Sequence, residues 1–442
     1  MKTNFLLVLS FIGGLFWTQA QETVPRKLSL QQAINYTLEN NYNFQRASNE
    51  IRIAEKRVWE ETSAGLPQIN GSVDYQNNVK QPIILFPDGD GGFTPITFGT
   101  KQNLNAGVNL SQLIFDGAYF VGLKYTRTYL DTRENALEKT ELVLRDGVIS
   151  AYTNVLFTQE GVSILEENIA LLQSNLEETR AFVEAGFAEE QNAEQLEITL
   201  ANLENDLNRS YRLEEIGLKM LKLTLGMDIN EELELTDNLE DLLLTHIDLE
   251  ILNRTLDLED HIDYRIAINE QTGNELLVRL EKSKYLPSIS AFANYQTVAN
   301  NDQFQFFQDD QQWFQSSVVG VSLQIPIFSS MQRSSRTQQA KIQLENSQIN
   351  VLETGQELEL NLRKAQSAYQ FSLDNFATAK RSLDLAQRIE RKENTKYFEG
   401  LSSSFDLTTA QNQLYSKQRE YLQAISSIIT SKSTLDNALN IK

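Results

Sequence analysis

Two similar stretches decide the fold of this chain: Gly65-Leu66-Pro67-Gln68-Ile69 and, further on, Leu286-Pro287-Ser288-Ile289. Each opens a run in which apolar and polar residues alternate, which is the period of a β-strand. A second alternating run follows each of them, at residues 104–110 and 319–325. The sequence therefore predicts two β-hairpins, 67–116 and 287–328, that repeat one unit.

Long helices are predicted after each pair of strands. The chain has only 7 prolines, and none lies in residues 96–286 or 327–442, so helices there need not be interrupted. Apolar and small residues over 144–183 are spaced alternately by four and three, as in a coiled coil. We predict a helix over 118–185, about 100 Å long, that turns at Gly186 and returns to residue 225. Residues 330–442 repeat this helical hairpin, with the turn at Gly400.

The duplication divides the chain into segments. Residues 1–20 read as a signal peptide, because Lys2 precedes an apolar stretch that ends near the small residue Ala20. The first repeat covers 21–225 and the second 261–442, each opening with a helix. In the first repeat this helix is expected to run from a cap at Ser29 to about residue 63. Residues 226–260 are expected to pack irregularly on the outside of the helices, and residues 81–100 to form a Gly- and Pro-rich loop.

Composition excludes several classes of protein. The 39 Lys and Arg against 60 Asp and Glu give a net charge of −21, whereas binding to nucleic acid needs a basic face. The absence of cysteine excludes thiol catalysis, thiolate metal sites and disulfides. No hydrolase, metalloprotease or nucleotide-binding motif occurs, and His246 and His261 are expected on the surface. The sequence therefore predicts neither an enzyme nor a cofactor.

The strands have one apolar face and one face of Asn, Gln and Ser, which suits a wall between lipid and a water-filled lumen. Four strands cannot close a barrel, and open sheet edges are not tolerated in lipid. The chain is therefore expected to oligomerise. The alternative is a small soluble sheet attached to a structural coiled coil, but this leaves the signal peptide and the duplication unexplained.

Further paired blocks carry a resemblance to a known family. They are Leu110-Ser111-Gln112-Leu113-Ile114-Phe115-Asp116-Gly117 and its counterpart Leu323-Gln324-Ile325-Pro326-Ile327-Phe328, together with Tyr397-Phe398-Glu399-Gly400 followed by Ser403-Ser404-Phe405-Asp406-Leu407. With the two opening stretches, the chain resembles the TolC-like outer-membrane efflux proteins over nearly its whole mature length.

The resemblance implies a mainly α fold with a small β part. Four strands per chain would form a twelve-stranded outer-membrane β-barrel in a homotrimer, continued by a periplasmic α-barrel of long antiparallel coiled-coil helices. It also implies contact with outer-membrane lipid, a periplasmic adaptor protein and an inner-membrane transporter. The expected function is a passive export duct for small molecules or proteins, in a tripartite efflux or type I secretion system. The alternative is an exported coiled-coil structural or adhesion protein without a pore.

The resemblance also suggests site residues at the periplasmic entrance. Asp406, six residues after Gly400, matches an aspartate that lines the entrance and favours cations, although Ser403 and Asp406 also fit a capping box. Tyr397 matches a tyrosine that helps to hold the entrance shut. Asn192 takes the place of Asp406 in the first repeat, and the turn residues Gly186 and Gly400 are expected as adaptor contacts. Ser402 and Thr409 stand where the family can have an arginine and a second aspartate.

Overall fold

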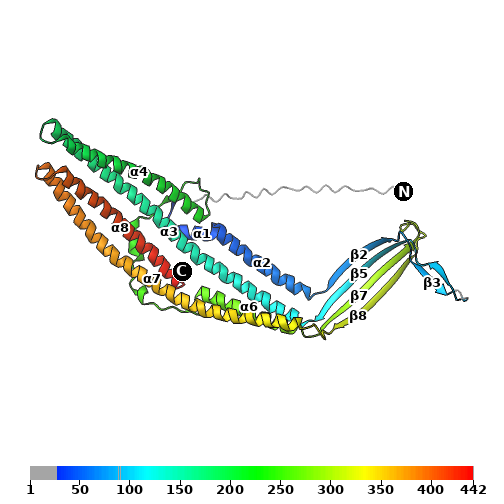
Figure 1. Ribbon diagram of the computed structural model, residues 1–442. Helices are drawn as coiled ribbons and strands as arrows, with labels where there is room; N and C mark the ends of the chain where they lie inside the picture. Colours follow the sequence, from blue (N-terminus) through cyan, green and yellow to red (C-terminus); the bar gives the residue numbers. More distant parts are fainter. Residues whose placement is uncertain (1–26, 88, 90, 442) are drawn as a thin grey trace, which may run out of the picture.

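The computed structural model describes residues 27–87, 89 and 91–441. The predicted signal peptide lies outside these residues. The molecule is long and narrow, with long helices forming one part and a sheet forming the opposite end (Figure 1). This arrangement confirms the predicted fold class, mainly helical with a small β part.

Two very long helices run through the helical part. The helix α3 spans Gly117–Glu184 (68 residues) and α7 spans Gln332–Phe398 (67 residues), so each is about 100 Å long at 1.5 Å per residue. The helices α4 (Glu190–Leu225) and α8 (Ser404–Ala438) return beside them. None of the helices in the described part of the chain combines the length and apolarity that crossing a membrane would take.

The helices form a wall whose make-up changes along its length. Near the helical turns, α3 lies between α4 and α8, and α7 packs on α8; towards the sheet, α3 instead contacts α2 (Tyr42–Ala64) and α6 (Ile262–Ser283) (Figure 1). The shorter helices meet end to end. The Asn41 amide beside α2 donates to the Thr224 carbonyl near the end of α4, at 2.6 Å. Asn440, just after α8, accepts from the Ile262 amide at the start of α6, at 3.3 Å.

The single helix expected from Ser29 to about residue 63 is wrong. Ser29 does cap a helix, through a capping box with Gln32, but α1 covers only Leu30–Asn40. Asn41 then has an extended backbone (ψ 133°), and its side chain accepts from the amides of Asn43 and Phe44 to start α2. This extended residue breaks the helix because its side chain caps the next one.

The sheet has four antiparallel strands in the order β2-β5-β7-β8, with bounds Gln68–Asn77, Gln102–Phe115, Ser288–Asn301 and Trp313–Gln324. The duplicated hairpins therefore lie side by side, joined through β5 and β7. One row of directly paired residues is Ile69, Leu110, Ala293 and Val319. The register thus places the predicted apolar positions of all four strands on one face.

Residues 81–100, expected to be a loop, contain a further, short β-hairpin. The strands β3 (Ile83–Pro87) and β4 (Phe93–Thr97) pair with each other and with no other strand among the described residues. The glycines between the two strands, together with Pro87 and Pro95 within them, favoured a loop over two short β-branched and aromatic runs, which favour strands. The hairpin projects beyond the end of the main sheet (Figure 1).

Residues 226–260 form part of the core near the middle of the helical wall. The strand β6 (Glu234–Leu235) pairs in parallel with β1 (Lys27–Leu28). It is followed by α5 (Leu239–His246) and a 3₁₀ turn, η1 (Glu250–Asn253). Leucines of α5 and Ile251 are buried in one cluster with Tyr152 and Ile428. The segment therefore fixes helices that lie far apart in the sequence.

The expectation that both histidines lie on the surface is wrong for His261, which is only 4% exposed. Its ring nitrogen Nδ1 accepts from the Asp263 amide at 3.2 Å, so His261 is the N-cap of α6. The same position before α2 is held by Asn41. A capping role explains why a polar side chain is buried here.

Candidate functional site: the helical turns and the sheet

The two long helices end in the same kind of turn. Gly186 has φ 75° and Gly400 has φ 74°, in the left-handed region that glycine tolerates best. In both turns the residue after the glycine donates to a carbonyl five residues back, Phe187 to Phe182 and Leu401 to Lys396, each at 2.8 Å. This pattern is a Schellman motif.

Asp406 lies in the first turn of α8, where it completes a capping box. The Ser403 hydroxyl donates to Asp406 Oδ2 at 2.7 Å and accepts from the Asp406 amide at 3.2 Å. The hydrogen bond from the Ser403 hydroxyl is the largest cause that lowers the pKa of Asp406, followed by that from the Ser403 amide. Asp406 is exposed, so it presents a carboxylate to solvent at neutral pH.

Asn192 connects the first hairpin to the second. Its Oδ1 accepts from the hydroxyl of the buried Ser404 at 2.8 Å, two residues before Asp406. The start of α4 thus touches the start of α8, and both lie at the same end of the molecule (Figure 1). The structure therefore brings Asn192 and Asp406 into one region, although only Asp406 carries a charge.

Tyr397 lies near the end of α7 and faces the first hairpin. Its hydroxyl is 3.2 Å from the Thr179 hydroxyl on α3, and its ring packs edge-on against Phe398. One turn earlier, the Asn175 amide donates to Asn394 Oδ1 at 3.3 Å. These contacts between the two hairpins are hydrogen bonds, and each contributes only about 1 kcal/mol to stability.

Sequence reasoning did not identify several partners in this region. Thr179 looked like a small seam residue of the coiled coil, and Ser404 like part of a cap. No local pattern marks Glu393, which accepts from the Ser402 hydroxyl at 3.0 Å and pairs with Lys396. The hydrogen bond from Lys396 is the largest cause that lowers the pKa of Glu393. The only available signal was a concentration of small polar residues near both turns.

The apolar face of the sheet is unusually exposed. Ile69 and Val73 on β2 are 70% and 72% exposed, and Val319 on β8 is 83% exposed. The opposite face carries rows such as Asn70, Asn109 and Asn294. In water such an apolar face would be covered, so its exposure indicates contact with lipid.

Aromatic side chains mark both ends of this face. Tyr75 packs against Phe304 at the far end of the sheet (ring centroids 5.5 Å), and Phe115 lies near Phe120 where strands meet helices (6.2 Å). Phe328, also near the helices, is 83% exposed. Aromatic residues gather at both interfaces of membrane barrels. The 10 residues of β2, at about 3.3 Å each and tilted by roughly 40°, span about 25 Å, the height of the apolar band in such barrels.

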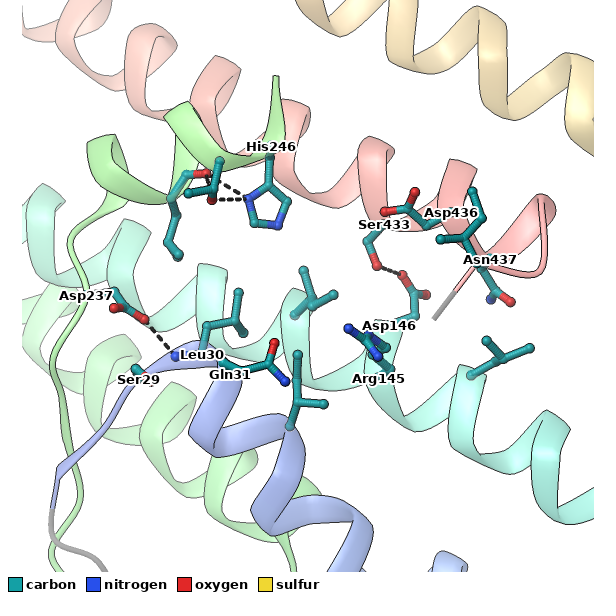
Figure 2. Close-up of a pocket in the computed structure, with 16 residues that line it drawn as sticks. Ser29, Leu30, Gln31, Arg145, Asp146, Asp237, His246, Ser433, Asp436 and Asn437 are labelled. Carbon is teal, nitrogen blue, oxygen red and sulfur yellow. Dashed lines mark hydrogen bonds between the residues drawn. The ribbon is translucent and has the colours of Figure 1, made fainter. Parts of the chain in front are cut away.

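A cavity of about 390 Å³ lies farther from the turns, where α1, α3, α5 and α8 meet. Two of its acidic residues already have hydrogen-bond partners in the protein. Asp146 accepts from the Ser433 hydroxyl, and Asp237 accepts from the Leu30 amide at 2.7 Å (Figure 2). His246 Nδ1 lies 2.7 Å from the Leu242 carbonyl, and burial is the main cause that lowers its pKa. The Asp146–Ser433 bond therefore joins α3 to α8, and the Asp237–Leu30 bond joins the mid-chain segment to α1.

Comparison with solved structures shows the same fold in several outer-membrane channels. The chain superimposes on CusC with a TM-score of 0.75, at 17% identity, over 93% of this chain and 92% of that one. The CmeC channel of Campylobacter jejuni superimposes with a TM-score of 0.72, at 18% identity, over 93% of this chain and 85% of that one. The open MtrE channel of Neisseria gonorrhoeae superimposes with a TM-score of 0.69, at 17% identity, over 93% of this chain and 89% of that one. A comparison with curated protein sequences found no match.

An exposed apolar sheet face joined to a wall of long helices is typical of one class of protein, membrane channels with a long helical part outside the lipid. The sequence model of the outer membrane efflux protein family matches residues 33–215 and 273–440, so the chain belongs to this family. The protein is a TolC-like outer-membrane efflux channel, as the resemblance predicted. Its four-stranded sheet, β2-β5-β7-β8, lies in the outer membrane and its helices extend into the periplasm.

Proposed function

We propose that three copies of the chain form one passive export duct. The observation that carries this proposal is the pair of open sheet edges: β2 and β8 each have one partner strand among the described residues, and the apolar face between them is exposed. Unpaired backbone groups cannot remain in lipid. Pairing β2 of one copy with β8 of the next satisfies both edges, and three copies give a barrel of twelve strands.

The long helices of the three copies continue this barrel as a periplasmic tube. An adaptor protein contacts the turns at Gly186 and Gly400, which are exposed and stand at the free end of the wall. An inner-membrane transporter supplies the energy for export. The type of cargo depends on that transporter.

The turn region serves as the entrance of this duct. Three copies of Asp406 around one axis concentrate negative potential and favour cations. Tyr397 holds the second hairpin against the first through Thr179, and the Ser404–Asn192 bond acts in the same place. The entrance opens when these hydrogen bonds exchange for bonds to water, which costs little net free energy.

Conductance of the purified protein in planar bilayers tests this function. We expect ion-conducting pores whose preference for cations falls when Asp406→Asn removes the charge. Asn can still accept the capping hydrogen bonds, so the fold should be kept. Asp406→Glu is the matched control that retains the charge and should retain the preference. Absence of conductance would contradict the channel, and an unchanged ion preference in Asp406→Asn would leave Asp406 as a helix cap only.

A further inference from the structure

The β3–β4 hairpin carries large apolar side chains that the rest of the described chain leaves largely exposed. Ile84 pairs with Ile96, and Leu85 pairs with Pro95 on the opposite face. Large apolar residues on both faces and at its base are 40–64% exposed, namely Ile83, Ile84, Leu85, Phe86, Phe93, Ile96 and Phe98. An isolated two-stranded hairpin is marginally stable in water, and an exposed apolar patch of this kind marks a contact surface.

The hairpin begins at an open edge of the sheet. It follows β2, which is an edge strand, while β8 forms the other edge. One row of paired residues runs Tyr75, Leu104, Ala299 and Trp313, so the end of β2 and the start of β8 lie at the same end of the sheet. When β2 of one copy pairs with β8 of the next, the hairpin emerges beside the loop that precedes the neighbour's β8.

That loop, residues 302–312, offers a matching apolar surface. Phe306 is 1% exposed and is buried with Leu104 and Ala299, which anchors the loop on the sheet. Phe304 and Phe307 of the same loop remain 61% and 82% exposed. Aromatic residues held on a fixed loop are effective contact residues because little side-chain freedom is lost on binding.

The charge of the hairpin disfavours a lipid surface as its partner. Residues 81–100 contain no Lys or Arg, and the sequence between the strands includes Asp88 and Asp90. Segments that bind anionic headgroups are instead rich in Lys and Arg. In addition, a membrane plane would cover one face of the hairpin, whereas a ring of copies surrounds each chain with two neighbours that it meets through different surfaces.

We propose that the β3–β4 hairpin packs against loop 302–312 of the neighbouring copy and so clasps the seam between copies at the outer end of the barrel. This inference rests on the proposed trimeric channel. It assigns a role to a segment whose sequence suggested only a loop. Because the clasp lies outside the lipid band, it acts in addition to the pairing of β2 with β8.

Cysteine cross-linking tests the clasp directly, because the chain contains no cysteine of its own. In the full-length protein in outer membranes, we expect Ile84→Cys or Leu85→Cys, each combined with Phe307→Cys, to give covalent trimers on a non-reducing gel. One of these two pairs should dominate, since adjacent strand residues point to opposite faces. The single variants should give no trimer. Ser72→Cys with Ser316→Cys or Val318→Cys reports separately on the β2–β8 seam.

The two sets of pairs distinguish the possible outcomes. Cross-links at the seam and at the hairpin support the clasp. Cross-links at the seam alone overturn it while leaving the trimeric channel intact; a spin label at Ile84→Cys that is then accessible to lipid-soluble oxygen would identify lipid as the partner. Absence of both sets overturns the trimer and the clasp together.

Discussion

The two helical hairpins share their turn but differ in what fills the seam between their helices. Between α3 and α4 the seam is made of large aliphatic residues, and Leu172 and Leu196 are both fully buried. Between α7 and α8, towards the turn, the buried residues include Ala386 and Ala410 and also the polar Glu390 and Gln411. The duplicated backbone therefore carries two different kinds of packing.

The polar seam of the second hairpin is incompletely satisfied. Among the described residues, hydrogen-bond partners are lacking for Glu390 Oε1, Thr408 Oγ1, both amide atoms of Gln411 and the Tyr415 hydroxyl. Each buried group left without a partner costs about 1–3 kcal/mol. We therefore expect the first hairpin to be the more rigid of the two and the second to rearrange more readily. Its contacts to the first hairpin near the turn include the hydrogen bond between Tyr397 and Thr179 and a ring contact between Phe398 and Phe182 (centroids 6.3 Å).

The largest expected effect comes from removing a leucine of the first seam. Leu196→Ala should destabilise the protein by about 2–5 kcal/mol, because it leaves a cavity between tightly packed helices. The change is measured as a lower temperature of thermal unfolding in detergent. Ile198→Ala on the same helix is the control, since Ile198 is 65% exposed, and should change stability by less than about 0.5 kcal/mol. Equal effects of the two substitutions would mean that the leucine seam does not hold the first hairpin.

Much of the fold could be predicted because it depends on periodicity. The alternation around Ile69 and Val319 defined both the strands and the shared apolar face, and the heptads over 144–183 defined α3. The contact of Asn41 with α4 and the burial of His261 could not be predicted, because each depends on a part of the chain that is distant in sequence. Thr224 receives the bond from Asn41 across 183 residues, and no local pattern records such a contact.

The candidate site was predictable only in part. The turns at Gly186 and Gly400 follow from glycine after a long helix, and the capping box of Asp406 follows from a local pattern. Contacts between the hairpins do not. Thr179 and Tyr397 are 218 residues apart, and a threonine in a heptad is equally suited to packing. The roles of Asp406 and Tyr397 at an entrance remain predictions, because they depend on neighbouring copies.

A smaller effect is expected at the buried acid of the second seam. Burial raises the pKa of Glu390, and the neighbouring Arg391 opposes this shift only partly. The folded state therefore binds the proton more tightly than the unfolded state, whose pKa is near 4.5. The contribution of Glu390 to the free energy of unfolding is therefore fully present below pH 4.5, and it is lost as the pH rises through the pKa of the folded state. Glu390→Gln should abolish this loss, because it cannot ionise.

Thermal unfolding of wild type and Glu390→Gln between pH 4 and 8 checks this expectation. The two proteins should be similar at the acidic end, and the variant should be the more stable at the alkaline end. Glu393→Gln is the matched control, because the pKa of Glu393 is lowered, mainly by its bond to Lys396, so this variant should lose stability at the alkaline end. Parallel profiles for wild type and Glu390→Gln would contradict a poorly solvated acid in this seam.

The smallest expected effect concerns the starts of α2 and α6, which lie near the ends of the returning helices α4 and α8. There Asn41 caps α2, whereas His261 caps α6 with an acceptor nitrogen that must stay unprotonated. Burial lowers the pKa of His261 and Asp263 only partly opposes this, so the unfolded state binds the proton more tightly. Stability is then complete above the unfolded pKa, near 6.5, and is lost as the pH falls below it.

His261→Asn gives the second repeat the cap of the first. At pH 7.5 its stability should differ from wild type by less than about 1 kcal/mol, since Asn is among the best N-caps. Between pH 7 and 5 the variant should lose less stability than wild type, because a titrating group has been removed. His246→Asn controls for the other histidine, whose pKa is also lowered by burial but which caps no helix start. If His261→Asn kept the full loss on acidification, while His246→Asn removed it, the acid-sensitive junction would lie at α5 and not at the start of α6.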